Sequence, residues 1–511
     1  MKKKNTKIYA SRFIVVALSI IAQAVGIWAL IFILNREFFS VQAFITTIGA
    51  ILFLSIVNRE QAAVYKIPWI IIFLIFPFAG VMVFLTFGNV RISKKQMRKF
   101  RHVYSESHDE YYGQKAVLKK LEETGNKGAG MAKYLKNATS LPVFNNTFTQ
   151  YLPTGEEFFD KLRKEISSAE RYVFLEYFII EEGVMWDGLF DILTEKIKKG
   201  VKVYLMYDDV GSMPKLPAKF YKQLQKQGFN ATKFNKFTPV VSISHNNRDH
   251  RKIAVIDGEK GFVSGANIAD EYINVSRPFG RWRDNAIFMK GQAVDSLVRL
   301  FIQLYNMSSV EQLVEEQFIF DHHEFIPDGF VFPFGDSPSP ITYEHIGENV
   351  YLDIINRADK YVYITTPYLI VDTPITDALK KAAERGVDVR IIIPEIPDKK
   401  LVYLLTKSFL PSLIRSGVKI YKYKEGFIHS KTFLSDGDVG VVGTINLDFR
   451  SLVHHFECAV WLYKTSSLID IYADFLRLFE VDCEQIAEEK ARLKWYERLI
   501  KSLLNLFAPL M

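Results

Sequence analysis

Two stretches of the chain carry the same chemically active residues at the same spacing. Each has the pattern H-x-K-x4-D, followed ten residues after the aspartate by an asparagine. The residues are His250, Lys252, Asp257 and Asn267 in the first stretch, and His429, Lys431, Asp436 and Asn446 in the second. Two complete copies indicate a duplicated unit, and they predict one active site built from two halves.

The residue types in these motifs suit the transfer of a phosphorus group. Residues two apart in a strand point to the same side, so each histidine should lie beside its lysine, with Arg251 and Ser430 pointing away. Two lysines can hold phosphate oxygens while one histidine attacks phosphorus and the other protonates the leaving alkoxide. A positioned acid or base typically accelerates such a step about 10²–10⁴-fold. We expect no metal and no cofactor, because no acidic or His/Cys cluster with ligand spacing is present.

Each histidine also needs an acceptor to orient its second ring nitrogen. We expect Glu457 to serve His429, which precedes it by 28 residues, and Asp284 to be the counterpart for His250. An ordinary surface carboxylate is the alternative for both. Asp257 and Asp436 begin the turns DGEKG and DGDVG, where they are catalytic residues, supports of the site or turn formers. Eight further histidines lack the motif and are predicted to be non-catalytic, including His322, His323, His454 and His455.

The residues around the motifs predict an α/β fold. Thr154 and Glu157 form a capping-box pattern at the start of a helix. The apolar run 171–180 predicts a buried strand, a helix over 189–198 ends at Gly200, and VKVYLMYDD predicts the next strand. The second half repeats this order, with helices over 350–358 and 375–383 and strands over 361–370 and 385–394. Two fused α/β/α domains sharing an interface follow from this pattern.

The beginning of the chain differs in composition from the rest. Three long apolar runs lie at 13–34, 38–57 and 67–87, and they predict membrane helices, one of them re-entrant or interfacial. Basic residues flank the runs at 1–12 and 91–101, which favours a cytoplasmic catalytic part. The net charge of +8 is compatible with anionic lipid or nucleic acid and decides for neither. Cys458 and Cys483 provide no disulfide framework and are expected to be buried thiols.

These observations divide the chain into five parts. They are a membrane anchor at 1–88, a basic connector along the membrane at 89–145, a first α/β domain at 146–330, a second at 331–465, and C-terminal helices at 466–511. The Pro- and Gly-rich stretch 327–340 predicts a linker between the domains. Basic and apolar residues alternate in 490–507, as in a helix that lies in a membrane interface; a helix packed on the domain is the alternative.

At its motifs the chain resembles the phospholipase D superfamily, in which two H-x-K-x4-D motifs form one active site. The membrane runs together with TPYLIVDTPITDALKKAAERGVDVRIIIP, FGDSPSP, EGFIHSKTFLSDGDVGVVGTINLDFRS and FECAVWLY are similar to bacterial cardiolipin synthases over residues 60–511. The resemblance implies two phospholipase D-like domains after N-terminal transmembrane helices. It also implies a multi-pass bacterial membrane protein that converts two phosphatidylglycerol molecules to cardiolipin and glycerol. Carried over, His250 is the nucleophile and His429 the acid and base.

Other functions remain open from the residues alone. A hydrolase or another headgroup exchanger would need the same motif residues, since these do not distinguish water from an alcohol as acceptor. A nuclease would also suit a basic chain, although three apolar runs argue against nucleic acid as a partner. A membrane scaffold without activity is disfavoured by two complete motifs. The oligomeric state is not predicted.

Overall fold

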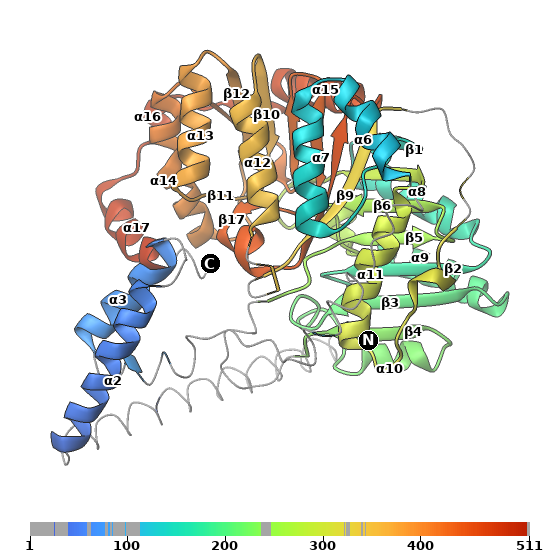
Figure 1. The fold of residues 1–511 in the computed structure, drawn as a ribbon, viewed down its shortest axis with the longest axis horizontal. Coiled ribbons are helices and arrows are strands. Elements are labelled where there is room, and N and C mark those ends of the chain that lie inside the picture. The colour runs from blue at the N-terminus through green and yellow to red at the C-terminus, as the bar shows by residue number, and fades with distance from the viewer. Residues whose placement is uncertain are drawn as a thin grey trace.

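The structure is a computed structural model with two α/β halves and a helical arm that projects from them (Figure 1). It describes residues 25, 39–58, 63–76, 80–81, 84, 98, 113–236, 247–320, 322, 328–338, 341–342 and 344–507. Each half is centred on a sheet of mixed parallel and antiparallel strands. The α/β class and the two halves expected from the sequence are therefore confirmed.

The first half contains a seven-stranded sheet in the order β1-β8-β6-β5-β2-β3-β4. Its strands are β1 (Thr147–Leu152), β2 (Tyr172–Tyr177), β3 (Lys202–Asp208), β4 (Asn230–Phe234), β5 (Ile253–Ile256), β6 (Lys260–Ser264) and β8 (Ala286–Gly291). Its helices are α8 (Gly155–Ser167), α9 (Val184–Lys198), α10 (Phe220–Gln225) and α11 (Val294–Ser308), with short 3-10 turns at Asp270–Ile273 and Glu315–Gln317.

The second half contains an eight-stranded sheet in the order β19-β13-β12-β10-β15-β16-β18-β9. Its strands are β9 (Phe330–Asp336), β10 (Tyr361–Thr365), β12 (Asp388–Pro394), β13 (Lys419–Tyr423), β15 (Thr432–Ser435), β16 (Val439–Gly443), β18 (Glu457–Tyr463) and β19 (Cys483–Gln485). Its helices are α6 (Gln114–Glu123), α7 (Asn126–Thr139), α12 (Ile346–Arg357), α13 (Thr373–Glu384), α14 (Lys400–Arg415), α15 (Ser467–Arg477), α16 (Glu488–Ala491) and α17 (Trp495–Phe507), with π-helical turns at Arg450–His454 and Leu478–Asp482.

The two sheets use the same strand order. Starting from β1 in one sheet and β9 in the other, each strand has a counterpart in the same position, and only β19 has none. In both sheets the motif strand, β5 or β15, lies between an antiparallel hairpin partner and the first strand of a parallel set. The shared order places the two motifs at equivalent positions.

Strand β2 is buried on both faces, as the apolar run predicts. Val173 and Leu175 face α8 and α9, whereas Phe174 faces α11 and stacks on Phe301 with ring centroids 4.2 Å apart. A strand covered on both faces has a nearly continuous apolar sequence instead of an alternating one. The sheet of this half is thus covered by helices on both faces, with α8 and α9 on one face of β2 and α11 on the other.

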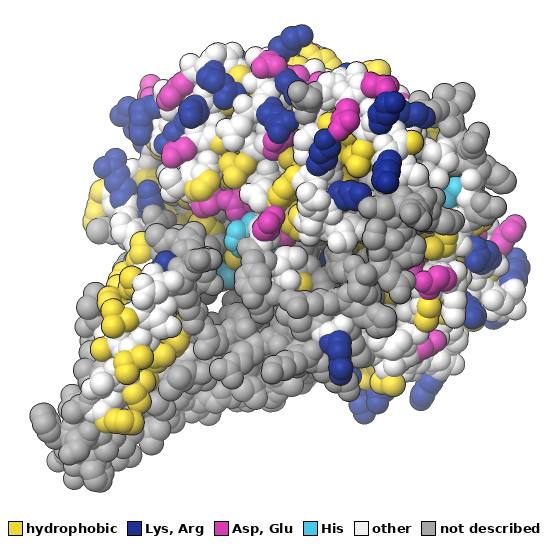
Figure 2. Space-filling model, in the orientation of Figure 1, with side chains coloured by type: hydrophobic (Ala, Val, Ile, Leu, Met, Phe, Trp, Pro, Cys, Tyr) yellow, Lys and Arg dark blue, Asp and Glu magenta, His cyan; other side chains and the backbone are white. Residues whose placement is uncertain are grey.

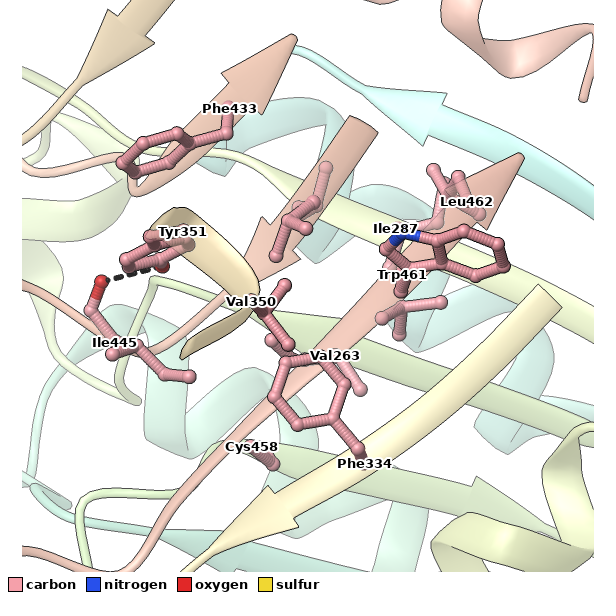
Figure 3. Packing of buried hydrophobic residues seen from close by; sticks show 14 of the residues in the cluster. Val263, Ile287, Phe334, Val350, Tyr351, Phe433, Ile445, Cys458, Trp461 and Leu462 are labelled. Carbon is pink, nitrogen blue, oxygen red and sulfur yellow. Dashed lines mark hydrogen bonds between the residues drawn. The ribbon is translucent and has the colours of Figure 1, made fainter. Parts of the chain in front are cut away.

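A continuous apolar core joins the two halves (Figure 3). Val263 and Ile287 come from the first sheet, while Phe433 and Trp461 come from the second, and all four are fully buried. Strands β6 and β16 are in contact across this interface. The halves are therefore held against each other by the hydrophobic effect, which is non-directional and scales with the apolar area removed from water.

Most of the predicted elements are present at their expected positions. The Thr154 hydroxyl accepts a hydrogen bond from Glu157 N at 3.2 Å, so the predicted cap of α8 is confirmed. The predicted strand over 361–370 is interrupted at Pro367, giving β10 and a separate short strand, β11 (Leu369–Ile370), which pairs with β17 (Leu447–Asp448). Cys458 and Cys483 are buried free thiols, as expected.

Two predicted connections are wrong in their described parts. The expected linker contains β9, which pairs with β18 along seven residues. Pro333 suggested a linker, because proline is excluded from central strands. It is tolerated here because β9 lies at the edge of the sheet. The expected connector contains α6 and α7, and Leu121 and Leu135 on them are fully buried against the second half. These helices are only 10 and 14 residues long, so the apolar periodicity in their sequences is too short to be recognised.

The projecting arm consists of α2 (Phe39–Val57) and α3 (Ala63–Ile75), and α17 contacts α3 near its base. Apolar side chains gather on the surface of this arm, and Phe44, Ile51 and Leu54 are among the exposed ones (Figure 2). Within the described residues, no helix combines the length and apolarity needed to cross a membrane. The first predicted run, 13–34, lies outside the described residues except for Val25.

Candidate active site

Each histidine motif lies against a segment of the opposite half. His250 N donates to Phe456 O at 2.9 Å, and Phe456 N donates to Arg248 O at 2.9 Å. In the same way, His429 N donates to Arg283 O at 2.7 Å, where β14 (Gly426–Ile428) pairs with β7 (Arg281–Arg283). Backbone pairing between the halves therefore fixes both motifs.

This pairing brings each histidine to a carboxylate of the other half. Glu457 directly follows Phe456, and both of its carboxylate oxygens lie 2.9 Å from His250 Nδ1. Asp284 directly follows Arg283, and its Oδ2 lies 2.6 Å from His429 Nδ1. Both carboxylates are fully buried, so neither is an ordinary surface group.

The predicted partners are correct as residues but were assigned to the wrong histidines. From the sequence, Glu457 is predicted to pair with His429 and Asp284 with His250, because each carboxylate follows that histidine in the same half. The structure has the reverse arrangement, since the segments pair across the interface between the halves. A single sequence contains no signal for such a crossing.

The two lysines complete a buried basic centre. Lys252 Nζ donates to His250 O at 2.6 Å, and Lys431 Nζ lies 2.8 Å from His429 Nδ1. Both motif segments precede their strands, β5 and β15, and Arg251 turns to the opposite side to donate to Leu300 O at 3.0 Å. The lysines and histidines are thus collected on one side, as predicted from their alternation.

Burial weakens the charges of all four motif groups. It lowers the pKa of Lys252 to about 8 and that of Lys431 to about 7, against the attraction of the nearby carboxylates. It also lowers the pKa of His429 to about 4, assisted by the Lys431 charge, and holds the pKa of His250 well below its usual value. Both imidazoles are therefore neutral near pH 7, the form in which a ring nitrogen can attack phosphorus.

The two carboxylates respond differently to the same burial. Burial acts to raise the pKa of Asp284, but the Lys431 charge, the interaction with the His429 ring and the hydrogen bond from Asn285 N outweigh it and hold that pKa below its ordinary value. Burial raises the pKa of Glu457 well above its ordinary value, although Lys252 opposes this, and Thr444 donates its hydroxyl to the carboxylate. Asp284 is thus the better partner for an imidazolium.

Asp257 and Asp436 are not brought to the histidines. The Asp257 carboxylate accepts from the backbone N–H groups of residues 170, 171 and 172, where β2 begins. Asp436 accepts in the same way from residues 359, 360 and 361 before β10. Both have positive φ, 56° and 54°, in the turns after β5 and β15. These contacts do not fit their prediction as catalytic residues, and of the two alternatives, site support and turn former, they fit the turn former.

The two asparagines also have different surroundings. Asn267 accepts from Ile179 N at 3.0 Å and donates to Tyr272 OH at 2.6 Å, so it joins the end of β2 to the ring beside His429. Asn446 is buried, and its Oδ1 has no hydrogen-bond partner within the described chain. Asn267 thus supports the ring beside His429, whereas the contacts of Asn446 assign it no role.

Sequence reasoning missed several residues of the site. His455 was predicted to be non-catalytic, but its ring centroid lies 5.4 Å from that of His250 and its Nδ1 lies 3.5 Å from Glu457 Oε1. The alternation of strand residues is the signal that could have found it, because His455 and Glu457 are two apart. Trp282 and Phe427 border His429, with ring centroids at 5.3 and 5.8 Å.

One group of described residues has the spacing of metal ligands. The ligand atoms of His250, His455 and Glu457 lie within 4.8 Å of one another. Two imidazoles and a carboxylate suit zinc. The positive charges of Lys252 and Arg248, both close enough to lower the pKa of His455, oppose a cation there. The absence of a metal from the reaction stays a prediction.

The fold and the paired histidines define a class of enzyme with a duplicated phospholipase D-like centre. A family model described as "Cardiolipin synthase, PLD-like domain" matches residues 162–301 and 351–482, one segment in each half. The chain therefore belongs to the cardiolipin synthase family of phospholipase D-like proteins.

Individual relatives agree with this assignment. A cardiolipin synthase of Halalkalibacterium halodurans is 33% identical, over 93% of this chain and 94% of the relative. A "Cardiolipin synthase 2" of Bacillus cereus is 32% identical, over 93% and 91%. An uncharacterised protein of Streptococcus mutans is 40% identical, over 91% and 100%. The crystal structure of phosphatidylserine synthase from Haemophilus influenzae shares the fold, with a TM-score of 0.57, 15% identity and coverage of 76% of this chain and 98% of that one.

Proposed function

We propose that the protein is a cardiolipin synthase, which transfers the phosphatidyl group of one phosphatidylglycerol to a second and releases glycerol. The observation that carries this proposal is the pair of histidine–carboxylate contacts, made across the two halves beside two buried lysines. Membership of the cardiolipin synthase family supports the choice of lipid.

In the first step, the Nε2 atom of His250 attacks the donor phosphorus. Nδ1 of His250 faces Glu457, which leaves Nε2 as the reacting nitrogen. The bond from phosphorus to the glycerol oxygen breaks, and His429 donates the proton that the departing alkoxide needs. A bound phosphate favours protonated His429, because an opposite charge stabilises imidazolium. Asp284, with its low pKa, holds that cation.

In the second step, a hydroxyl of the other phosphatidylglycerol takes the place of the leaving glycerol. Neutral His429 removes the hydroxyl proton, the oxygen attacks phosphorus, and the phosphorus–nitrogen bond to His250 breaks. Lys252 and Lys431 stabilise the charge on the phosphate oxygens in both steps. Two lipids enter, cardiolipin and glycerol leave, and both histidines return to their starting forms.

The apolar surface of the arm supports a place for this reaction at a membrane. We infer that 1–88 attaches the enzyme to the bacterial membrane in several passes, with the catalytic halves on the cytoplasmic side. What supports this is the apolar runs of the sequence, their basic flanks and the exposed apolar residues on α2. The basic charge of the chain is compatible with anionic lipid at that surface.

Product analysis tests the proposed reaction. Purified enzyme in liposomes receives phosphatidylglycerol labelled in both its lipid and its glycerol parts, and the lipids and water-soluble products are separated. The expected result is cardiolipin and glycerol in equal amounts. Phosphatidic acid with glycerol and no cardiolipin would mean that water is the acceptor, and the proposal would be wrong.

A further inference from the structure

Next to His250 the structure contains buried hydrogen-bond donors without partners. Within the described chain, Asn247 Nδ2 and Arg248 Nε and Nη2 make no hydrogen bond, although both residues are only 4% exposed. A buried donor without a partner destabilises the folded state, because it loses its hydrogen bonds to water and gains none in the protein. Three such atoms on two neighbouring residues, just before the motif histidine, therefore call for a ligand.

The guanidinium of Arg248 is held in place by only one of its edges. Nη1 donates to Asp208 Oδ1 at 3.3 Å and to Asn235 O at 3.2 Å. The opposite edge, formed by Nε and Nη2, is the one without partners. Two parallel N–H groups at that edge match two oxygens of a phosphate, which arginine binds in a bidentate manner.

These donors lie close to the reacting histidine. The Arg248 carbonyl accepts from Phe456 N, on the segment that also fixes His250 and carries Glu457. After burial, Arg450, His454 and Lys252, the charge of Arg248 also contributes to the low pKa of His455, whose ring neighbours that of His250. Arg248 therefore lies within electrostatic reach of His455, the ring next to His250.

The acidic groups near Arg248 do not cancel this basic character. The Asp208 carboxylate already accepts from the backbone N–H groups of residues 210, 211 and 249. Burial raises the pKa of Asp249 to about 7 and holds that of Glu176 well above its ordinary value. Both groups are therefore less negative near neutral pH than exposed carboxylates, and Asp208 pairs with the Nη1 edge of Arg248, away from the free edge.

The proposed reaction needs such a site. The donor phosphate is held at the motif lysines, but the acceptor lipid carries its own phosphate, joined to the attacking hydroxyl through a short glycerol. We propose that Asn247 and Arg248 form a second anion subsite that binds the phosphate of the acceptor phosphatidylglycerol. This inference rests on the proposed function and gives it a means of preferring a lipid acceptor over water or glycerol, which carry no phosphate.

Acceptor competition tests the subsite in the full-length enzyme in liposomes. Phosphatidylglycerol serves as donor and acceptor, and labelled free glycerol serves as a neutral competing acceptor that is exchanged into phosphatidylglycerol. In R248Q the ratio of cardiolipin formed to glycerol exchanged should fall about 10- to 100-fold, as expected for loss of a charge-assisted bidentate contact. N247A should lower the same ratio by a smaller factor. R299Q is the matched control, since Arg299 is also buried but pairs with Glu315 at 2.8 Å.

The outcomes separate the two proposals. If wild-type enzyme forms cardiolipin and the ratio in R248Q equals that of R299Q, the subsite is refuted and the proposed function stands. If wild-type enzyme forms no cardiolipin, both proposals are wrong. If R248Q shows no turnover at all, the same ratio is measured in R248K. Lysine keeps the positive charge but lacks the two parallel N–H groups of the guanidinium. A lowered ratio in R248K supports the subsite, and an unchanged ratio refutes it.

Discussion

The two motif histidines have unlike surroundings, although their motifs are alike. His429 lies among Trp282, Tyr272 and Phe427 and faces a carboxylate that is easily ionised. His250 faces Glu457, whose pKa is raised by burial. This asymmetry supports His250 as the neutral nucleophile and His429 as the group that gains and loses a proton.

Removing either histidine should stop the reaction. We expect H250A and H429A each to abolish turnover, and the double variant to be no worse than either, because the two groups act as one unit. Cardiolipin formation in liposomes is the measurement, and thermal unfolding of each variant checks that it is folded. A single variant with half of the wild-type activity would contradict the single shared site.

The pH dependence should follow the lysines and histidines. In the first step the reacting complex has neutral His250, a His429 that takes up a proton as the phosphate binds, and charged lysines, whose charges are lost as the pH rises through about 7 for Lys431 and about 8 for Lys252. We therefore expect kcat/KM to fall on an alkaline limb between about pH 7 and 8. K431R, whose charge does not titrate there, should move that limb upward. An unchanged limb in K431R would show that another group controls it.

At the scale of elements, the aspartates of the motifs fix where strands begin. Asp257 holds three backbone N–H groups at the start of β2, and Asp436 does the same for β10. Because β2 and β10 lie beside the motif strands, each aspartate ties its motif turn to its sheet.

Replacing Asp257 should therefore affect stability more than chemistry. D257A leaves three N–H groups unpaired and places alanine at positive φ, which should cost about 2–4 kcal/mol of unfolding free energy. D257N should cost less, because asparagine tolerates that backbone conformation. Thermal unfolding measures the loss, and the folded fraction should retain turnover. Complete inactivity of well-folded D257N would instead assign Asp257 to the reaction.

The sequence predicted elements well where local patterns decide them. The cap at Thr154, the buried strand β2 and the pairs His250–Lys252 and His429–Lys431 follow from spacing alone. The carboxylate partners could be found as residues but not assigned, since β7 and β14 pair across the two halves and the His429–Asp284 contact joins residues 145 positions apart. Strand β9 was missed because Pro333 suggests a loop until its position at the sheet edge is known.

At the scale of the whole molecule, one end of the structure exposes apolar surface. Trp495 at the start of α17 is 74% exposed, whereas Trp186, Trp282 and Trp461 are buried. Helix α17 also contacts α3 of the arm. An exposed tryptophan beside an apolar arm is typical of a helix that lies at a membrane interface.

Quenching by lipid tests this position of α17. In a background with Trp28 and Trp69 replaced by phenylalanine, brominated phosphatidylglycerol should quench part of the tryptophan fluorescence of the reconstituted enzyme. Trp495→Phe should remove that quenched part, because Trp495 alone among the remaining tryptophans is exposed. Trp186→Phe is the control and should leave it. Equal quenching before and after Trp495→Phe would place α17 away from the lipid.

The exchange of carboxylates between the halves has a consequence during synthesis. The carboxylate partner of His250, Glu457, is synthesised 207 residues after it. At about 5–20 residues per second, that interval lasts about 10–40 s on the ribosome. Throughout it, the nascent chain has an unsupported nucleophile and no acid. The membrane is thereby spared from an incomplete enzyme that could cleave phospholipid without rejoining it.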